Sequence, residues 1–205
     1  QVKKKNYSLK GRLLKSREGC FCFLDHIKNT KQKIDKIKKN KALIKNSKFI
    51  YFTKKIDEIF KNRRNKILLN YKKKFLSKKF KLSNLIVSPS DFGYNNILLN
   101  SNKLVFLDFE YSGLDDPLKL CLDFLANPNT KFNKPENEAF LKKFSNIFKI
   151  KNLKTKYNDY IDFYYIKWSI IILKYYLNKN KNSKAKINKS IEQSKKYLIN
   201  KRVWK

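Results

Sequence analysis

The stretch SPSDFGYNNILL (residues 88–99), followed by LVFLDFE (residues 104–110), is the most informative part of this chain. The β-prone ends of the two runs are separated by a short polar segment, which predicts a β-hairpin. Asp91 then falls on the loop before the hairpin, Asn96 at the start of the hairpin and Asp108 at its end. Because a hairpin returns the chain beside itself, Asp108 is expected to lie alongside Asn96.

These three side chains are of the types that phosphoryl transfer to a hydroxyl requires. A loop carboxylate such as Asp91 can accept the hydroxyl proton, and amide and carboxylate oxygens are ligands that Mg²⁺ prefers. Taken singly, Asp91 could cap a turn, Asn96 could end a strand and Asp108 could be an ordinary turn residue. Together and in this order, they predict a general base at Asp91 and Mg²⁺ ligands at Asn96 and Asp108.

The segment from residue 85 to residue 128 resembles the aminoglycoside phosphotransferase and choline kinase family, which has the protein-kinase-like fold. SDFGYNN (residues 90–96) is similar to the family's His-x-Asp-x4-Asn loop, and DFE (residues 108–110) to the strand end that follows it. Asp116-Pro117 and Asp123 match the acidic positions of the next helix. The longer sequence of this segment, SPSDFG followed by DFEY and DDP, is similar to that of an uncharacterised bacterial branch of the family.

The resemblance implies an ATP- and Mg²⁺-dependent kinase that phosphorylates a hydroxyl of a sugar, an aminoglycoside or an amino alcohol. It implies that Asp91 is the catalytic base and that Asn96 and Asp108 bind Mg²⁺. Glu110 would extend the metal shell, and Asp123 would be a buried anchor for the backbone of the catalytic loop. The implied partners are therefore a small hydroxyl compound and a nucleotide.

Three departures from the family concern the N-terminal part of the chain and the loop. The family's loop His falls at Pro89, the four glycines form no Gly-rich loop, and residues 1–48 show no convincing β-sheet. We therefore expect the N-terminal β lobe to be missing or vestigial, with residues 1–15 a basic linker or a remnant of it and residues 16–205 the helical lobe. Since the chain contains no Met, it is expected to be a piece of a longer product, and its activity alone stays open.

The predicted fold class is α+β, mainly α. Apolar residues at spacings of three and four predict amphipathic helices. The apolar residues of the 157–177 stretch exceed one face, so this helix is expected to be central to the core. The expected helices cover residues 16–44, 49–76, a segment starting at Pro117, 136–148, 157–177 and 187–199.

The net charge of +34 comes from 50 basic residues, of which five are Arg. One interpretation is a surface selected for nucleic acid or another polyanion. The other is compositional drift, because Lys residues are spread along the chain and Arg, which suits base and phosphate recognition, is scarce. The charge leaves one alternative to an enzyme, a cationic helical polyanion-binding protein. A second, separate alternative is a pseudokinase scaffold.

The three cysteines form no Cys-x-x-Cys pair, and the single His, His26, offers no metal-ligand partner set. We expect reduced, buried thiols and a core or surface histidine. No apolar run is long enough to cross a bilayer, and no apolar core follows the basic N-terminus as it would in a signal peptide. The expected location is cytoplasmic.

Overall fold

The structure is a computed structural model that describes residues 15–40, 43–90, 92–101, 103–179 and 184–204, without the side chains of 176–179. These described residues form seven α-helices, two short 3-10 helices and four short strands, so the prediction of a mainly helical chain is confirmed. Within these ranges, no helix combines the length and the apolar character needed to cross a membrane. The predicted linker or remnant at residues 1–15 lies outside the described residues except for Lys15.

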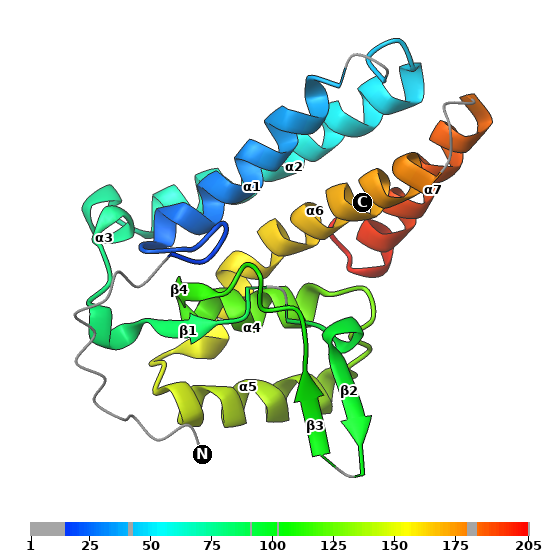
Figure 1. Cartoon of the computed structure of the whole chain (residues 1–205). Coiled ribbons are helices and arrows are strands. Elements are labelled where there is room, and N and C mark those ends of the chain that lie inside the picture. The colour runs from blue at the N-terminus through cyan, green and yellow to red at the C-terminus, as the bar shows by residue number, and fades with distance from the viewer. Residues whose placement is uncertain (1–14, 41–42, 91, 102, 180–183, 205) are drawn as a thin grey trace.

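Four long helices form the upper part of the molecule in Figure 1, and α6 is their centre. Helix α6 contacts α1, α2 and α7 on one side and α4 and α5 further along. Its residues Phe163, Ile166, Ile170 and Leu173 are fully buried, which confirms the prediction that this stretch is central. The bounds are α1 Phe23–Lys38, α2 Ser47–Asn70, α6 Leu153–Lys179 and α7 Lys184–Asn200.

Helix α1 is shorter at both ends than the helix predicted over residues 16–44. The Asp25 carboxylate accepts hydrogen bonds from the backbone N–H groups of Phe21 (2.9 Å) and Cys22 (3.0 Å). This arrangement satisfies donors that a helix start leaves free, so the helix begins at Phe23. The preceding segment is consequently irregular, and it lies close to the candidate site described below.

The helix predicted over residues 49–76 is broken in two. Helix α2 ends at Asn70, and a short helix α3, Lys73–Ser77, follows. At the break, Tyr71 has extended backbone and its hydroxyl donates to Asp159 of α6 at 2.6 Å. A tertiary hydrogen bond therefore ends α2 where the local pattern alone would continue it.

The four strands form two separate antiparallel pairs. The predicted hairpin is confirmed, whereas the strand β4 was not predicted. The bounds are β1 Ile86–Ser88 with β4 Gly113–Asp115, and β2 Ile97–Asn100 with β3 Lys103–Phe106. The 3-10 helices η1 (Leu82–Asn84) and η2 (Tyr94–Asn96) precede β1 and β2.

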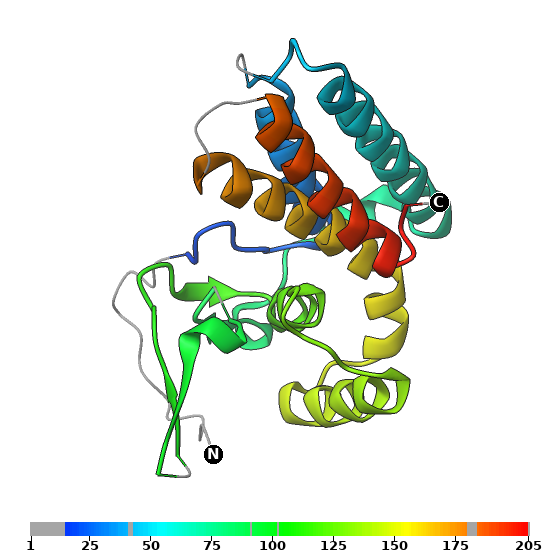
Figure 2. The same cartoon turned by 90° about the vertical axis from the view of Figure 1, so that its right-hand side faces the viewer.

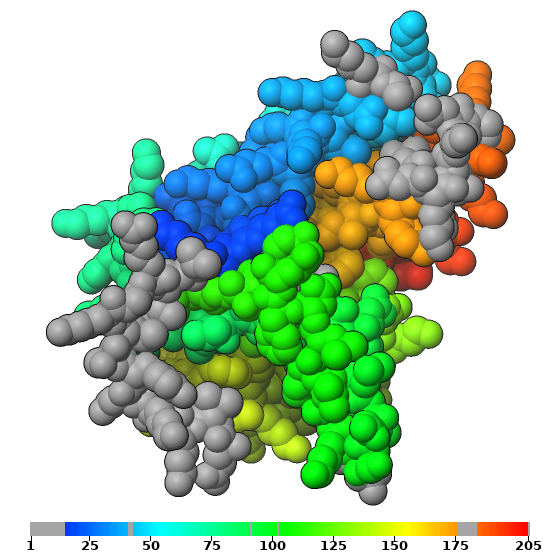
Figure 3. All heavy atoms as spheres, viewed as in Figure 1, coloured from blue at the N-terminus to red at the C-terminus, as the bar shows by residue number. Residues whose placement is uncertain are grey.

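The β2–β3 hairpin projects away from the helices in both Figure 1 and Figure 2. Among the described residues its strands pair only with each other. Leu99 and Leu104 are 72% and 61% exposed, and Figure 3 shows the hairpin lying at the surface. The side chains of this hairpin therefore contribute little to the core.

Helix α4, Pro117–Ala126, links the strands to the long helices, and all of it except Leu120 is buried. It starts as predicted, because Pro117 occupies the first position and Asp116 accepts from the Leu118 N–H at 3.0 Å. Its Phe124 ring stacks on Phe140 of α5, Lys134–Phe148. Helix α4 thereby supports the loop and the hairpin from behind.

Candidate active site

Asn96 and Asp108 lie at the base of the β2–β3 hairpin. Ile97 pairs with Phe106 in the ladder, and the Leu107 N–H donates to the Asn96 carbonyl oxygen at 2.9 Å. Asp108 follows directly, so the hairpin brings the backbones of the two predicted Mg²⁺ ligands together. This is the relationship expected from the hairpin in the sequence.

Asp108 has a left-handed backbone, with a φ of 61°. For an ordinary residue this conformation costs roughly 1–2 kcal/mol, although Asp and Asn tolerate it because their short side chains bond locally. Such residues are concentrated at functional sites. The Asp108 and Glu110 side chains are both exposed to solvent, where a ligand can reach them.

Asp91, the predicted base, lies outside the described residues, but both of its neighbours are well anchored. On one side, the Ser90 hydroxyl donates to the Arg17 carbonyl oxygen at 3.0 Å. On the other side, the Phe92 ring stacks on Phe106 of the hairpin. Gly93 follows, and a Cβ there would lie 2.5 Å from the side-chain amide nitrogen of Asn127, so a larger residue would require this side chain to move.

Asp123 is buried on α4, where two lysines approach its carboxylate. The Lys167 ammonium donates to Oδ1 at 2.6 Å, and the Lys119 ammonium lies 3.5 Å from Oδ2. Burial favours the neutral acid, but the two cations outweigh it and hold the pKa of Asp123 below its usual value. Among the described residues, Oδ2 has no hydrogen-bond partner, and the anchoring role implied for Asp123 stays a prediction.

Asp115 organises this region, and the sequence analysis did not identify its role. Its side chain is fully buried, pairs with Lys119 at 2.9 Å, and accepts from the Ser16 hydroxyl (2.7 Å) and the Cys20 N–H (2.8 Å). It therefore ties the segment before α1 to the start of α4. The signal available was the four-residue spacing of Asp115, Lys119 and Asp123, which places Lys119 and Asp123 on one face of α4 with Asp115 just before its start.

His26 is buried and joins α1, α4 and α6. Its Nε2 lies 3.1 Å from an Asp116 carboxylate oxygen, and its Nδ1 lies 2.6 Å from the Tyr164 hydroxyl. Burial alone would lower the pKa of His26, but the Cys20 sulfur and the Asp116 carboxylate outweigh burial and raise this pKa to about 10. The prediction of a core or surface histidine is confirmed as core, and all three cysteines are buried free thiols, as expected.

This raised pKa predicts how stability depends on pH. A histidine whose pKa is about 10 in the folded state and about 6.5 in the unfolded chain stabilises the fold fully below pH 6.5, and this contribution is lost as the pH rises to 10. We expect His26→Gln to lower the free energy of unfolding at pH 7 by about 1–3 kcal/mol and to show a smaller difference near pH 10. Thermal unfolding of both proteins from pH 6 to pH 10 measures this gap. If the stability difference between the two proteins increased with pH, a charged His26 would be contradicted.

A cavity of about 880 Å³ opens beside the candidate site. Its wall includes Ser90 and Asn96 on either side of position 91, Asp123 from α4, and Trp168 from α6. The Trp168 indole N–H donates to the Asp123 carbonyl oxygen at 3.3 Å, which fixes the ring against α4. Small-molecule sites typically enclose ~300–1,000 Å³, so this cavity has the size of such a site.

The residues at the hairpin base fit a Mg²⁺ ion by their chemistry. Asn96 and Asp108 offer an amide and a carboxylate oxygen, and Mg²⁺ is commonly held by one or two protein oxygens together with water and substrate phosphates. In the part of the chain that the structure describes, no group of three or more His, Cys, Asp and Glu side chains is arranged to hold a metal.

Comparison with known proteins gives one solved structure to report. The chain is similar to choline kinase from Cryptosporidium parvum Iowa II, with a TM-score of 0.49 and 15% sequence identity. The match covers 98% of this chain and 62% of the choline kinase, so the chain spans less than two thirds of the length of that protein. No family model and no curated protein matches the sequence. A likeness of this size assigns neither a family nor an activity, so the site is assigned from its own residues.

Proposed function

We propose that this chain is the helical part of a phosphotransferase that moves the γ-phosphoryl group of ATP to a hydroxyl of a small molecule. One observation carries the proposal: the hydrogen bond from the Leu107 N–H to the Asn96 carbonyl oxygen. It brings the backbone of Asp108 beside Asn96, and Asn96 lines a cavity of small-molecule size. This supports the proposal, because phosphoryl transfer needs metal ligands close to the catalytic loop.

Each residue has a distinct part in the proposed reaction. Asp91 orients the acceptor hydroxyl and accepts its proton as the hydroxyl oxygen bonds to the γ-phosphorus and the bond from that phosphorus to the leaving ADP breaks. Asn96 and Asp108 hold Mg²⁺, and Glu110 extends its shell. When bound, Mg²⁺ offsets the charge of the phosphate oxygens. Asp123 supports the loop from α4, where the lysines beside it keep its carboxylate ionised.

The proposal is tested by measuring ADP release and acceptor phosphorylation by the full-length protein, with and without Mg²⁺, over a panel of sugars, amino alcohols and aminoglycosides. The expected result is transfer that requires both ATP and Mg²⁺. Mg²⁺-dependent nucleotide binding without turnover would indicate a pseudokinase scaffold instead. The absence of both nucleotide binding and turnover would overturn the proposal.

Replacing Asp108 with Asn should raise the Mg²⁺ concentration needed for half-maximal rate by at least ~10-fold, because one anionic ligand is lost. Asn tolerates the left-handed backbone at this position, so the fold should be kept. The measurement is the initial rate over a Mg²⁺ titration at fixed ATP. The control is Glu138→Gln, which removes an exposed carboxylate from α5, and an equal shift in both variants would contradict a role for Asp108 in binding the metal.

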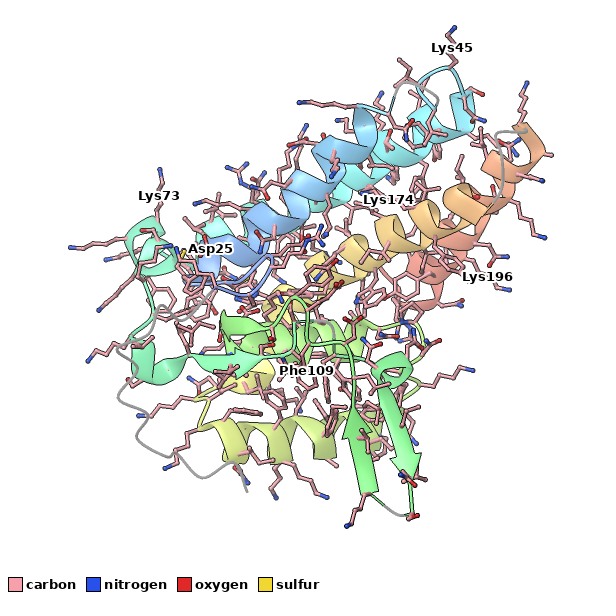
Figure 4. The ribbon with its side chains drawn as sticks, viewed as in Figure 1. Asp25, Lys45, Lys73, Phe109, Lys174 and Lys196 are labelled. Atoms are coloured by element: carbon pink, nitrogen blue, oxygen red, sulfur yellow. The ribbon has the colours of Figure 1, made fainter. Side chains whose placement is uncertain are left out.

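The polyanion-binding alternative is not favoured by the distribution of the lysines. Lys45, Lys73 and Lys196 extend from different parts of the molecule in Figure 4 rather than from one face. A selected nucleic-acid surface would concentrate such charges in a patch or stripe. If polyanion binding were nevertheless the function, its affinity would survive loss of Asp91 and would fall steeply with salt.

A further inference from the structure

The charge of the cavity beside the candidate site is strongly unbalanced. Among the described residues that line it, five are basic and two are acidic. The acidic residues are Glu18 and Asp123, and the basic residues are Arg17, Lys33, Lys119, Lys167 and Lys196.

Both acidic side chains are already paired with lysines. Asp123 lies between Lys119 and Lys167, as described above. Glu18 pairs with Lys33 at 2.5 Å and lies 3.9 Å from Lys167. These lysines hold the pKa values of both carboxyl groups below their usual range. Neither carboxylate is left to offset the charge of a positively charged ligand.

Two of the basic side chains have no such acidic partner. Within the described residues, neither Arg17 nor Lys196 forms an ion pair with a carboxylate. The Arg17 guanidinium instead lies 4.4 Å from the centre of the Tyr111 ring, and Lys196 is exposed on α7. Arginine and lysine presented in this way bind phosphate or carboxylate groups.

The cavity also offers an apolar surface to the body of a ligand. Trp168, Ile171, Ile172 and Tyr175 come from successive turns of α6 and line the same cavity. Such a wall suits a carbon skeleton or a sugar ring, with polar groups turned toward the charged residues. The combination is an apolar wall with unpaired cations beside a candidate catalytic loop.

We propose that the acceptor of this site is a hydroxyl compound that also carries an anionic group, a phosphate or a carboxylate, and that cationic acceptors such as amino alcohols and aminoglycosides are disfavoured. The inference rests on the proposed function for the transfer step, and it narrows the acceptor class. Arg17 and Lys196 bind the anionic group, and the α6 wall contacts the carbon skeleton. In the described lining of this cavity, an amine would find no carboxylate that is not already paired with a lysine.

The test compares sugars of one skeleton and different charge: glucose 6-phosphate, gluconate, glucose and glucosamine. Calorimetric titration of the full-length protein at ~150 mM ionic strength, where long-range attraction is screened, gives each dissociation constant. We expect glucose 6-phosphate or gluconate to bind most tightly and glucosamine most weakly. The comparison of glucose 6-phosphate with gluconate shows whether the site prefers a phosphate or a carboxylate.

Lys196→Gln should weaken binding of the tighter anionic sugar by about 5-fold, because one partly exposed charge contact is lost, and should leave glucose unchanged. Lys143→Gln is the matched control, since Lys143 is exposed on α5 and does not line the cavity. An equal effect of both substitutions would overturn the proposal, because it would show attraction to the overall charge of the protein.

Three further outcomes would also overturn the inference: tightest binding of glucosamine, no saturable binding of either anionic sugar, or a Lys196→Gln effect confined to the KM for ATP. The last result would assign these cations to the nucleotide phosphates. Failure of the proposed function looks different, because anionic sugars would then bind with the expected preference but receive no phosphate from ATP.

Discussion

Replacing Asp91 with Asn is expected to lower the kcat of the full-length protein by about 10²–10⁴-fold, the usual contribution of a general base. The Asn side chain keeps the size of the carboxylate but cannot take the proton of the attacking hydroxyl. Ser90 and Phe92 anchor the chain on both sides of this position, so the fold should be kept. The measurement is steady-state phosphoryl transfer at saturating ATP and Mg²⁺, with nucleotide binding expected to stay the same.

The matched control for this prediction is Asp35→Asn on α1, where the carboxylate pairs with Lys31 away from the hairpin. It removes the same charge and should leave kcat within about twofold, as for a surface substitution. If Asp91→Asn retained full activity, the assignment of the base would be wrong. Equal losses in both variants would show that net charge, and not the loop, controls the rate.

Replacing Lys119 with Met is expected to destabilise the fold by about 3–5 kcal/mol, because it leaves the buried Asp115 carboxylate without its cation and Asp123 with Lys167 alone. Lys119 is 2% exposed and lies between Asp115 and Asp123 on α4. In a chain of this size such a loss lowers the unfolding temperature by roughly 10 °C. Thermal and denaturant unfolding at pH 7 both measure it.

Two comparisons make this second prediction specific. Lys143→Met, at an exposed position of α5, should change stability by no more than about 0.5 kcal/mol. Adding Asp115→Asn to Lys119→Met should recover part of the loss, because the uncompensated charge of Asp115 disappears while the hydrogen bonds to this position can be kept. Losses that simply add would show that Asp115 and Lys119 do not depend on each other.

The elements with strong local signals could be predicted from the sequence. The β2–β3 hairpin and the start of α4 at Pro117 depend on turn and capping residues next to each other in the chain. The start of α1 was missed because Cys22 is an uncommon capping residue and the donors are satisfied by Asp25 instead. The break after α2 and the strand β4 depend on partners far along the chain, which no local pattern reveals.

The same distinction applies to the candidate site. The backbone relation of Asn96 to Asp108 could be predicted, because it follows from one hairpin. The lysine partners of Asp123 could not, since Lys167 reaches it only through the packing of α6 on α4. The joining of His26, Asp116 and Tyr164 likewise combines three helices. The residues proposed for catalysis are thus local in sequence, whereas the partners of Asp123 and His26 come from distant parts of the chain.

The exposed hairpin also determines the conditions in which this protein can be handled. Among the described residues, the outer edge of each strand has no partner strand, and leucines such as Leu99 and Leu104 are exposed to solvent, a combination that promotes aggregation by strand pairing. Repulsion between molecules with a net charge of +34 opposes this aggregation, and added salt weakens the repulsion. Low ionic strength therefore reduces aggregation but strengthens non-specific binding of anions. The ionic strength of the buffer has to balance these two effects.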